Sequence, residues 1–217
     1  MSKPLKMIRK HHISPDHQEQ FINFLLRLHV DDPDLHAILK EKAQGYLCNS
    51  LTQIADQNTL TNPSFWFVNS GMVICIMTDY KKVKVTTLTF KAGDVAMIPQ
   101  GMAARGMFQY YLLACPNTHL MGFNRNDLNG LCAQYPDLKD LYNKVLKMQI
   151  DKFKEHAELG VLEAKARIQR FFQLYPEVEG PDKAVDLRNK YQGSYLGLNR
   201  TYFSRMLATI KNDKTES

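Results

Sequence analysis

The chain has 217 residues, of which 44% are hydrophobic and 23% are charged, a balance typical of a folded globular protein, and its formal net charge is +6. Its longest apolar run, Phe65 to Met77, is interrupted at Asn69 to Gly71 and is shorter than the roughly 20 residues that a membrane-spanning helix needs. The basic residues near the N-terminus are not followed by the apolar stretch of a secretory signal, so we expect a cytoplasmic protein with no membrane partner.

Residues 16–39 carry apolar side chains spaced three and four positions apart, which predicts helix. Asp31, Asp32 and Pro33 interrupt this spacing, because a proline inside a helix removes a hydrogen bond and clashes with the preceding turn. The segment is therefore predicted to form two short helices.

Residues 45–120 contain runs of β-branched and aromatic residues separated by turn signals such as Asn69–Gly71 and Ala92–Asp94. Short strands at this spacing are typical of an antiparallel sandwich or roll. Within Val83–Phe90 the alternation of apolar residues slips by one position, which predicts a β-bulge in a strand with one buried face.

The cysteines and histidines show no metal-binding pattern. No pair of cysteines has the Cys-x-x-Cys spacing of zinc sites, and the ligands of iron–sulfur clusters usually share one short loop. Only His119 lies within the predicted strands, where a metalloenzyme built on a roll would need clustered ligands. We expect no metal and no enzymatic activity, although haem ligation by His119 or Cys75 stays open. Buried structural roles are expected for Cys48, Cys75, Cys115 and Cys132.

Residues 137–156 contain no glycine or proline, which predicts one long helix with two apolar stripes. Two stripes imply two neighbours, so one stripe is expected to lie against the strands and the other against the same helix of a second subunit. A single wide core-facing stripe in a monomer is the alternative. The second stripe comprises Tyr142, Leu146, Ile150 and Phe153. The first stripe has coiled-coil spacing and is assigned to dimerisation: Leu138, Leu141, Val145 and Met148.

A hinge is expected at Glu158–Gly160, followed by an amphipathic helix over residues 161–174. The segment with the most specific sequence pattern then runs from Lys190 to Lys211. A short helix ends at Tyr195–Leu196, Gly197 supplies a tight turn and Asn199 caps the next helix. This order predicts a helix-turn-helix motif, with an ordinary helical hairpin as the alternative. The residues expected to pack inward from the second helix are Phe203, Met206, Leu207 and Ile210.

The outer face of this motif is basic and polar. Residues 183–211 contain six basic residues and one acidic residue, which is typical of a polyanionic partner, although charge alone fits a basic face that serves only solubility equally well. A recognition helix presents its N-terminal residues to base edges in the major groove, and the helix before it meets phosphates. The predicted DNA-binding residues are Arg200, Thr201, Ser204, Arg205 and Lys211 in the second helix and Lys190, Gln192 and Ser194 in the first.

Three stretches carry a resemblance to a known family. Tyr195–Arg205 is similar to a Ser-Tyr-Leu-Gly-Ile-Thr-x-x-x-Leu-Ser-Arg run in members from Bacteroidetes, and Phe67–Gly71 and Phe90–Asp94 look like two glycine turns of the same proteins. The chain thus resembles the Crp/Fnr family of dimeric regulators over nearly its whole length. The resemblance implies double-stranded DNA and a second copy of the chain as partners, with RNA polymerase as a candidate partner.

The fold that the resemblance implies is α+β with three parts. Residues 1–136 would form an antiparallel β-roll of the cyclic-nucleotide-binding type, a jelly roll or double-stranded β-helix, with flanking helices. Residues 137–159 would form the dimerisation helix and hinge, and residues 160–217 the helix-turn-helix domain.

The family's cyclic-nucleotide site does not match this sequence. Such a ligand needs backbone N–H groups at a helix start, an arginine for the phosphate and a carboxylate for the ribose. The positions where the family carries Gly-Glu and Arg-Ser are here Met97-Ile98 and Phe108-Gln109. We therefore predict no cofactor and a degenerate pocket. A different effector could still be held by Gly101, Arg105, Gly106, Phe108 and Gln109.

Two functions from different classes remain. The leading hypothesis is a sequence-specific DNA-binding transcription regulator. The alternative is a β-roll sensor module that binds a small ligand and whose C-terminal helices mediate protein contacts.

Overall fold

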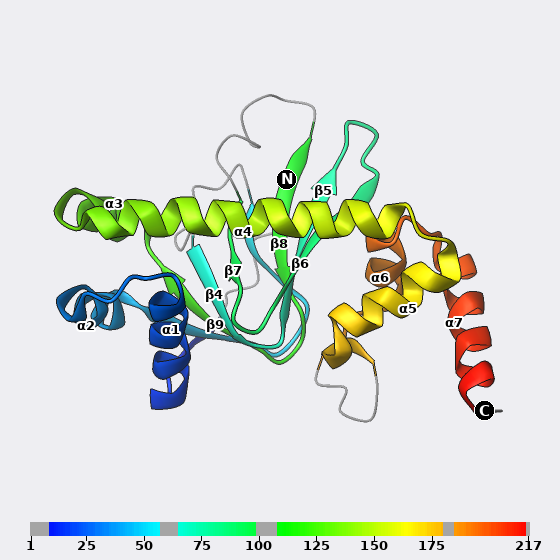
Figure 1. The fold of residues 1–217 in the computed structure, drawn as a ribbon, viewed down its shortest axis with the longest axis horizontal. Helices are drawn as coiled ribbons and strands as arrows, with labels where there is room; N and C mark the ends of the chain where they lie inside the picture. Colours follow the sequence, from blue (N-terminus) through cyan, green and yellow to red (C-terminus); the bar gives the residue numbers. More distant parts are fainter. Residues whose placement is uncertain (1–8, 57–64, 99–107, 180–184, 216–217) are drawn as a thin grey trace.

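The computed structural model describes residues 9–56, 65–98, 108–179 and 185–215 (Figure 1). The strands are β1 Arg9–His11, β2 Gln44–Cys48, β3 Thr52–Asp56, β4 Phe65–Ser70, β5 Met72–Thr78, β6 Lys84–Lys91, β7 Val95–Ala96, β8 Gln109–Ala114 and β9 Thr118–Phe123. The helices are α1 Pro15–Arg27, α2 Pro33–Lys42, α3 Arg125–Gln134, α4 Pro136–Gly160, α5 Ala164–Leu174, the 3-10 turn η2 Pro176–Val178, α6 Asn189–Tyr195 and α7 Arg200–Thr215.

The strands form two antiparallel sheets packed face to face, which confirms the predicted roll. The first sheet has the order β1-β2-β9-β4-β7 and the second β3-β8-β5-β6. The register of β5 and β6 shifts between Cys75 and Ile76, opposite Thr86 and Leu88, so the predicted bulge is present. Gly71 joins β4 to β5 with φ +81°, and a Cβ there would lie 2.5 Å from the Thr118 Oγ1 atom. Only glycine fits this turn.

The space between the sheets is filled by side chains. Trp66, Phe90 and Leu112 are fully buried there and pack with aliphatic residues from both sheets. Cys48 and Cys75 lie in the same layer, and burial raises the pKa of both thiols to about 11. The predicted core role is confirmed for these two cysteines, whose thiols stay protonated and unreactive at neutral pH.

Helices α1 to α4 cover the outer face of the first sheet. The predicted pair of short helices is confirmed, and Asp32 caps the start of α2, where its Oδ1 accepts hydrogen bonds from the backbone N–H groups of Asp34 (2.9 Å) and Leu35 (3.1 Å). Phe21 and Phe24 of α1 pack against Phe67 of the sheet. This layer fixes the N-terminal half of α4 against the roll.

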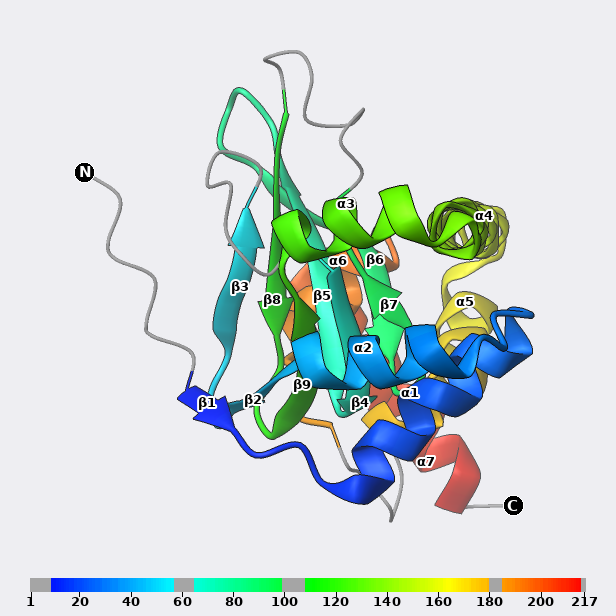
Figure 2. The ribbon, with the colours of Figure 1, turned by 90° about the vertical axis from the view of Figure 1, so that its left-hand side faces the viewer.

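Helix α4 runs the length of the molecule, with α1 to α3 at one end and α5 to α7 at the other (Figure 1). Figure 2 looks along this helix and shows the roll beside it. The helix continues four residues beyond the predicted end at His156 and includes Glu158–Gly160, so the predicted hinge position is wrong. The helical conformation is interrupted at residues 161–163, and α5 begins at Ala164 rather than Val161. Within the described segments no helix is both long and apolar enough to cross a membrane, and no three His, Cys, Asp or Glu side chains are placed to bind a metal ion.

The C-terminal helices pack on the outer face of the second sheet. Met72, Ile74 and Ile76 alternate along β5 and point away from the roll interior into one apolar core with the C-terminal helices. Strand β5 is therefore buried on both faces, which explains its uninterrupted apolar sequence. The partners from the C-terminal helices that are least exposed are Ile168, Phe171, Tyr175, Tyr195 and Phe203.

Candidate nucleic-acid interface

The turn between α6 and α7 has the geometry that its sequence predicts. Gly197 adopts φ +66°, and the backbone N–H of Leu198 donates to the Gly193 carbonyl at 2.8 Å. The Asn199 Oδ1 atom accepts a hydrogen bond from the backbone N–H of Tyr202 at 2.8 Å. The predicted glycine turn and asparagine cap are thus both present, and they fix where α7 begins.

Arg167 of α5 holds this turn in place and was not singled out by the sequence. Its Nη1 atom donates to the Leu196 carbonyl at 2.7 Å, immediately before the glycine turn. Its Nη2 atom donates to the carbonyls of Gly160 (2.9 Å) and Leu162 (2.7 Å), at the end of α4. One guanidinium therefore ties the helix-turn-helix to the α4–α5 junction, and no local sequence pattern signals such a bond.

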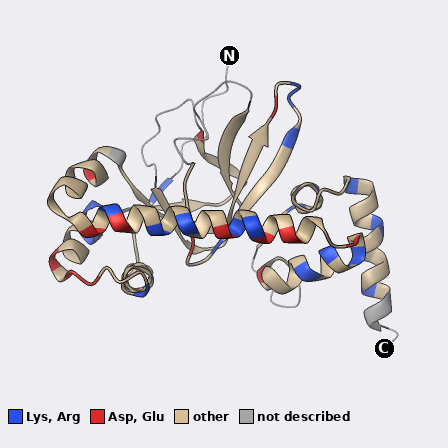
Figure 3. Ribbon diagram, turned by 45° about the horizontal axis from the view of Figure 1, so that its top comes forward, with Lys and Arg blue, Asp and Glu red and all other residues tan. Residues whose placement is uncertain are grey.

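Helix α7 is divided into a buried and an exposed face. Phe203 and Ile210 are buried and Met206 and Leu207 pack beside them, which confirms the four residues predicted to face inward. The predicted recognition residues Arg200, Thr201 and Arg205 are exposed. Figure 3 shows basic residues at several positions along α7. The guanidinium groups are therefore accessible from solution.

A basic groove of about 420 Å³ lies between the starts of α6 and α7. Its walls bring together three of the predicted residues, Lys190, Arg200 and Ser204. Arg188, which precedes α6, and Asn189, its first residue, complete the lining and were not among the predicted contacts. The groove offers ammonium, guanidinium, amide and hydroxyl donors, the groups with which proteins contact phosphates and base edges.

Three other predicted DNA contacts bond within the chain, and burial corrects the assignment of one of them, Gln192, while Ser194 and Lys211 stay predictions. Gln192 is only 5% exposed, and its Nε2 atom donates to the Leu187 carbonyl. The Ser194 hydroxyl oxygen accepts the backbone N–H of Thr86 at 2.9 Å. The Lys211 ammonium forms an ion pair with Glu179 at 3.0 Å. The Ser194 contact forms because α6 packs directly on the second sheet.

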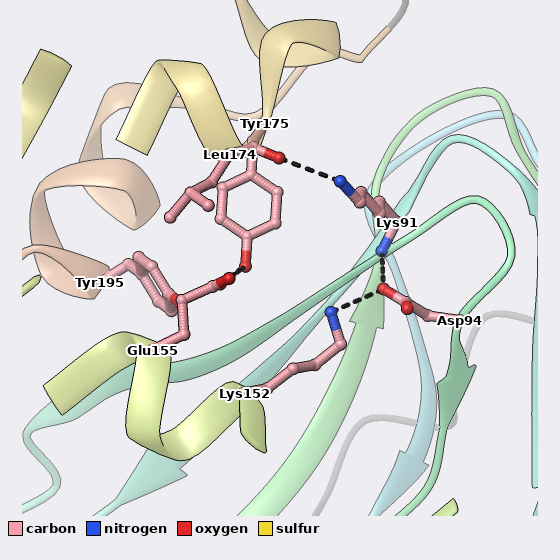
Figure 4. A network of polar contacts seen from close by, with 7 residues as sticks. All are labelled: Lys91, Asp94, Lys152, Glu155, Leu174, Tyr175 and Tyr195. Atoms are coloured by element: carbon pink, nitrogen blue, oxygen red, sulfur yellow. Dashed lines mark hydrogen bonds and ion pairs between the residues drawn. The ribbon is translucent and has the colours of Figure 1, made fainter. Parts of the chain in front are cut away.

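Polar contacts join the roll, α4 and the C-terminal helices around Tyr175 (Figure 4). The Tyr175 hydroxyl donates to Glu155 Oε1 at 3.1 Å, and burial raises the pKa of this phenol far above its usual value, so it stays a donor. The Lys91 ammonium donates to the Leu174 carbonyl at 3.1 Å, and Lys152 forms an ion pair with Asp94 at 2.8 Å. The roll, α4 and the end of α5 are thus joined by polar as well as apolar contacts.

Solved structures of transcription regulators share this arrangement. A Crp/Fnr-family transcriptional regulator from Eubacterium rectale is 13% identical and matches with a TM-score of 0.66 over 88% of this chain and 88% of its own. FixK2 from Bradyrhizobium japonicum is 15% identical, with a TM-score of 0.58 over 79% of this chain and 86% of its own. The chain has the Crp/Fnr fold.

A third match with the Crp/Fnr fold is the c-di-GMP-responsive regulator CLP from Xanthomonas campestris, 16% identical, with a TM-score of 0.58 over 84% of this chain and 93% of its own. No family model matches the sequence, and no curated protein is significantly similar to it. At these identities the likeness establishes the Crp/Fnr fold, and function has to be argued from the site.

The place where Crp/Fnr proteins hold a cyclic nucleotide is apolar in the described residues. Met97 is buried, its carbonyl accepts the Gln149 amide at 3.1 Å, and Ile98 packs against the roll interior. Phe108 and Gln109 are exposed. These four described side chains include no cation. The other predicted effector-pocket residues, Gly101, Arg105 and Gly106, lie outside the described residues.

The stripe of α4 that was assigned to dimerisation faces the chain's own core. Leu138, Leu141 and Val145 are at most 4% exposed and pack with α1, α2 and the first sheet, and Met148 packs beside them. This assignment is corrected because helices α1 to α3 cover that side of α4. The other apolar stripe retains exposed surface, with Tyr142 41% and Ile150 54% exposed.

Proposed function

We propose that this chain is a sequence-specific DNA-binding transcription regulator of the Crp/Fnr type. The proposal rests on the helix-turn-helix, in which a glycine turn and an asparagine cap place Arg200 at the start of an exposed helix. An exposed arginine at this point of a recognition helix can form two hydrogen bonds with guanine in the major groove. This is the single observation that carries the function.

The basic groove supports the same partner. Lys190 and Arg200 line it together, so phosphate contacts from α6 lie beside base contacts from α7. Arg205 and Thr201 extend the exposed face along α7. Phosphate contacts position a protein on the duplex and base contacts supply specificity, and the groove offers donors for both.

We also propose that the regulator is a homodimer joined through α4. The exposed residues Tyr142 and Ile150 lie on one stripe with Leu146, and an isologous contact would pair this stripe with its copy. Two recognition helices would then read half-sites about one helical turn apart, roughly 34–36 Å. RNA polymerase remains a candidate partner, and the cyclic-nucleotide pocket is proposed to be degenerate.

The DNA-binding proposal is tested by fluorescence anisotropy with a duplex from the region upstream of the gene, at stated salt. Arg200→Ala and Arg205→Ala are each expected to lose about 1–3 kcal/mol of binding free energy and to relax specificity at one base position. The matched control is Arg170→Ala, which removes an exposed arginine of α5 whose Nη1 atom donates to Gln173 Oε1 at 3.2 Å. It should bind as the wild type does.

A second measurement separates base contacts from general attraction. Lys190→Ala should weaken binding to specific and to non-specific duplexes by similar factors. It should also reduce the slope of log affinity against log salt concentration by about 1. Wild-type-like binding by both arginine variants would contradict the recognition-helix assignment. Absence of any DNA binding would favour a sensor module whose helices contact protein.

A further inference from the structure

The turn that joins β5 to β6 carries lysines next to the basic groove of the helix-turn-helix. Lys82 lies in this turn and Lys84 begins β6. Both line a cavity of about 830 Å³ between the second sheet and α6, and Lys190 of α6 lines it from the other wall. Lys190 also lines the basic groove, so the cavity and the groove adjoin at this residue.

The two linings together form one surface, which we call the basic track. Figure 3 shows basic residues on the β5–β6 turn as well as on α7. The track runs from the roll across the start of α6 to the start of α7, and its cations are Lys82, Lys84, Arg188, Lys190 and Arg200.

The chain does not neutralise the cations of the basic track. All five are exposed, and within the described segments none of them forms an ion pair. The carboxylates beside the β5–β6 turn have other partners: Asp56 accepts the Gln53 amide at 3.1 Å, and Asp79 accepts the backbone N–H of Val83 at 2.8 Å. A row of exposed, unpaired cations creates a positive potential that attracts a polyanion.

Lys82 occupies a strained backbone conformation. Its φ is +62°, in the left-handed region that favours glycine and asparagine. Its backbone N–H donates to the Asp79 carbonyl at 3.0 Å, which closes the turn and holds this conformation. A lysine at such a position costs stability that a glycine would not. Strain of this kind is typical of functional positions, which indicates that the Lys82 ammonium serves a partner outside the fold.

The β5–β6 turn is held at a fixed position relative to α6. The backbone N–H of Thr86, two residues after Lys84, donates to the Ser194 hydroxyl at 2.9 Å, and β6 contacts α6 directly. The fold therefore sets the spacing between Lys84 and Lys190. Cations on such a preorganised surface lose little conformational freedom when they bind, so more of their attraction contributes to affinity.

We propose that the β5–β6 turn is a second contact with the DNA backbone, in which Lys82 and Lys84 bind phosphates beside those bound by Lys190. The inference rests on the proposed function and extends its interface from the helix-turn-helix to the roll. Phosphates carry no base identity, so these lysines raise the affinity for every duplex and leave specificity to α7.

The test is the salt dependence of DNA binding by the full chain, followed by fluorescence anisotropy between about 50 and 200 mM salt. Each phosphate contact adds about 0.9 to the slope of log affinity against log salt concentration. The double variant Lys82→Gln/Lys84→Gln is therefore expected to reduce this slope by about 2 and to weaken binding at least about tenfold at about 0.1 M salt. Specific and non-specific duplexes should lose affinity by the same factor, whereas Arg200→Ala should lower the ratio of the two affinities.

A single variant separates the lost charge from a damaged fold. Lys82→Gly removes the ammonium and suits the positive φ, so it should weaken DNA binding without lowering the melting temperature. The matched control is Lys40→Gln/Lys42→Gln, which removes two exposed lysines from α2, at the other end of α4 from the helix-turn-helix (Figure 1). Its salt slope should equal that of the wild type.

The inference is overturned if Lys82→Gln/Lys84→Gln keeps the wild-type slope and affinity. It is also overturned if the α2 control loses as much, because the loss would then reflect net charge alone. These two results leave the proposed function intact, since both are obtained with a wild-type chain that binds DNA. A wild-type chain that binds no duplex overturns the proposed function and this inference together.

Discussion

The core shared by the second sheet and the C-terminal helices predicts that the roll and the helix-turn-helix unfold together. Ile168 of α5 is fully buried in this core, beside Ile74 of β5 and Phe171. The substitution Ile168→Ala removes side-chain volume from the C-terminal side of the interface only. Its effect on the roll therefore measures how strongly the two parts depend on each other.

The expected magnitude follows from the burial of Ile168. Replacing a fully buried isoleucine by alanine costs about 2–5 kcal/mol through lost transfer free energy and the cavity left behind. At a urea slope of about 2 kcal/mol/M, a loss of about 3 kcal/mol lowers the unfolding midpoint by about 1.5 M. Protomer concentration has to be held constant, because dimerisation would also contribute to stability.

The assay is urea unfolding followed by tryptophan fluorescence and by far-ultraviolet circular dichroism. Trp66 is the sole tryptophan and lies inside the roll, across the second sheet from Ile168, so its fluorescence reports the roll alone. We expect the urea midpoints of the fluorescence and circular dichroism signals to fall together in Ile168→Ala. Gln169→Ala, which changes the exposed neighbour on α5, should shift neither by more than about 0.5 kcal/mol. An unchanged Trp66 midpoint in Ile168→Ala would refute a shared core.

Three further predictions concern single positions. Gly197→Ala should cost about 1–2 kcal/mol in a thermal melt, because φ is +66° there while the nearest atom, Arg167 Nη1, leaves room at 3.6 Å; an unchanged melt would show that the turn relaxes. Burial, and the His17 and His11 rings 5.1 and 5.5 Å away, lower the pKa of His119. On acidification the unfolded chain therefore takes up protons first, and the free energy of unfolding falls as pH drops below about 6.5. His119→Gln should flatten this pH dependence, and curves of unfolding free energy against pH that run parallel for variant and wild type would contradict the assignment. Ile150→Glu places a charge on the exposed stripe of α4 and should give monomers in sedimentation velocity, whereas Gln169→Glu on α5 should not; a dimeric Ile150→Glu would place the subunit contact elsewhere.

The exposed face of α4 shows how a correct pattern led to a wrong residue assignment. Two apolar stripes were visible in the sequence, and both occur in the structure. The choice between them failed because Leu138 and Val145 have the better coiled-coil spacing, yet α1 and α2 cover that side. Which stripe stays exposed depends on helices about 100 residues earlier in the chain.

The packing of the C-terminal helices on the sheet had one signal in the sequence. Residues 73–77 are all apolar, and a strand in which consecutive side chains are all apolar is typically buried on both faces. The alternation in Val83–Phe90, by contrast, indicated one buried face. A comparison of these two strands could have shown that another part of the chain packs on the outer face of β5.

The helix-turn-helix, the paired N-terminal helices and the bulge in β6 were determined by the sequence itself, because each depends on residues a few positions apart. A glycine turn with φ +66° and an asparagine cap act within one helical turn. The partners of Ser194 and Lys211 within the chain were decided only by tertiary structure. Ser194 contacts Thr86, 108 positions away, and no local pattern encodes that partner. The cavity between α6 and the second sheet likewise exists only in the folded chain, since its two walls come from residues 51–113 and 190–194.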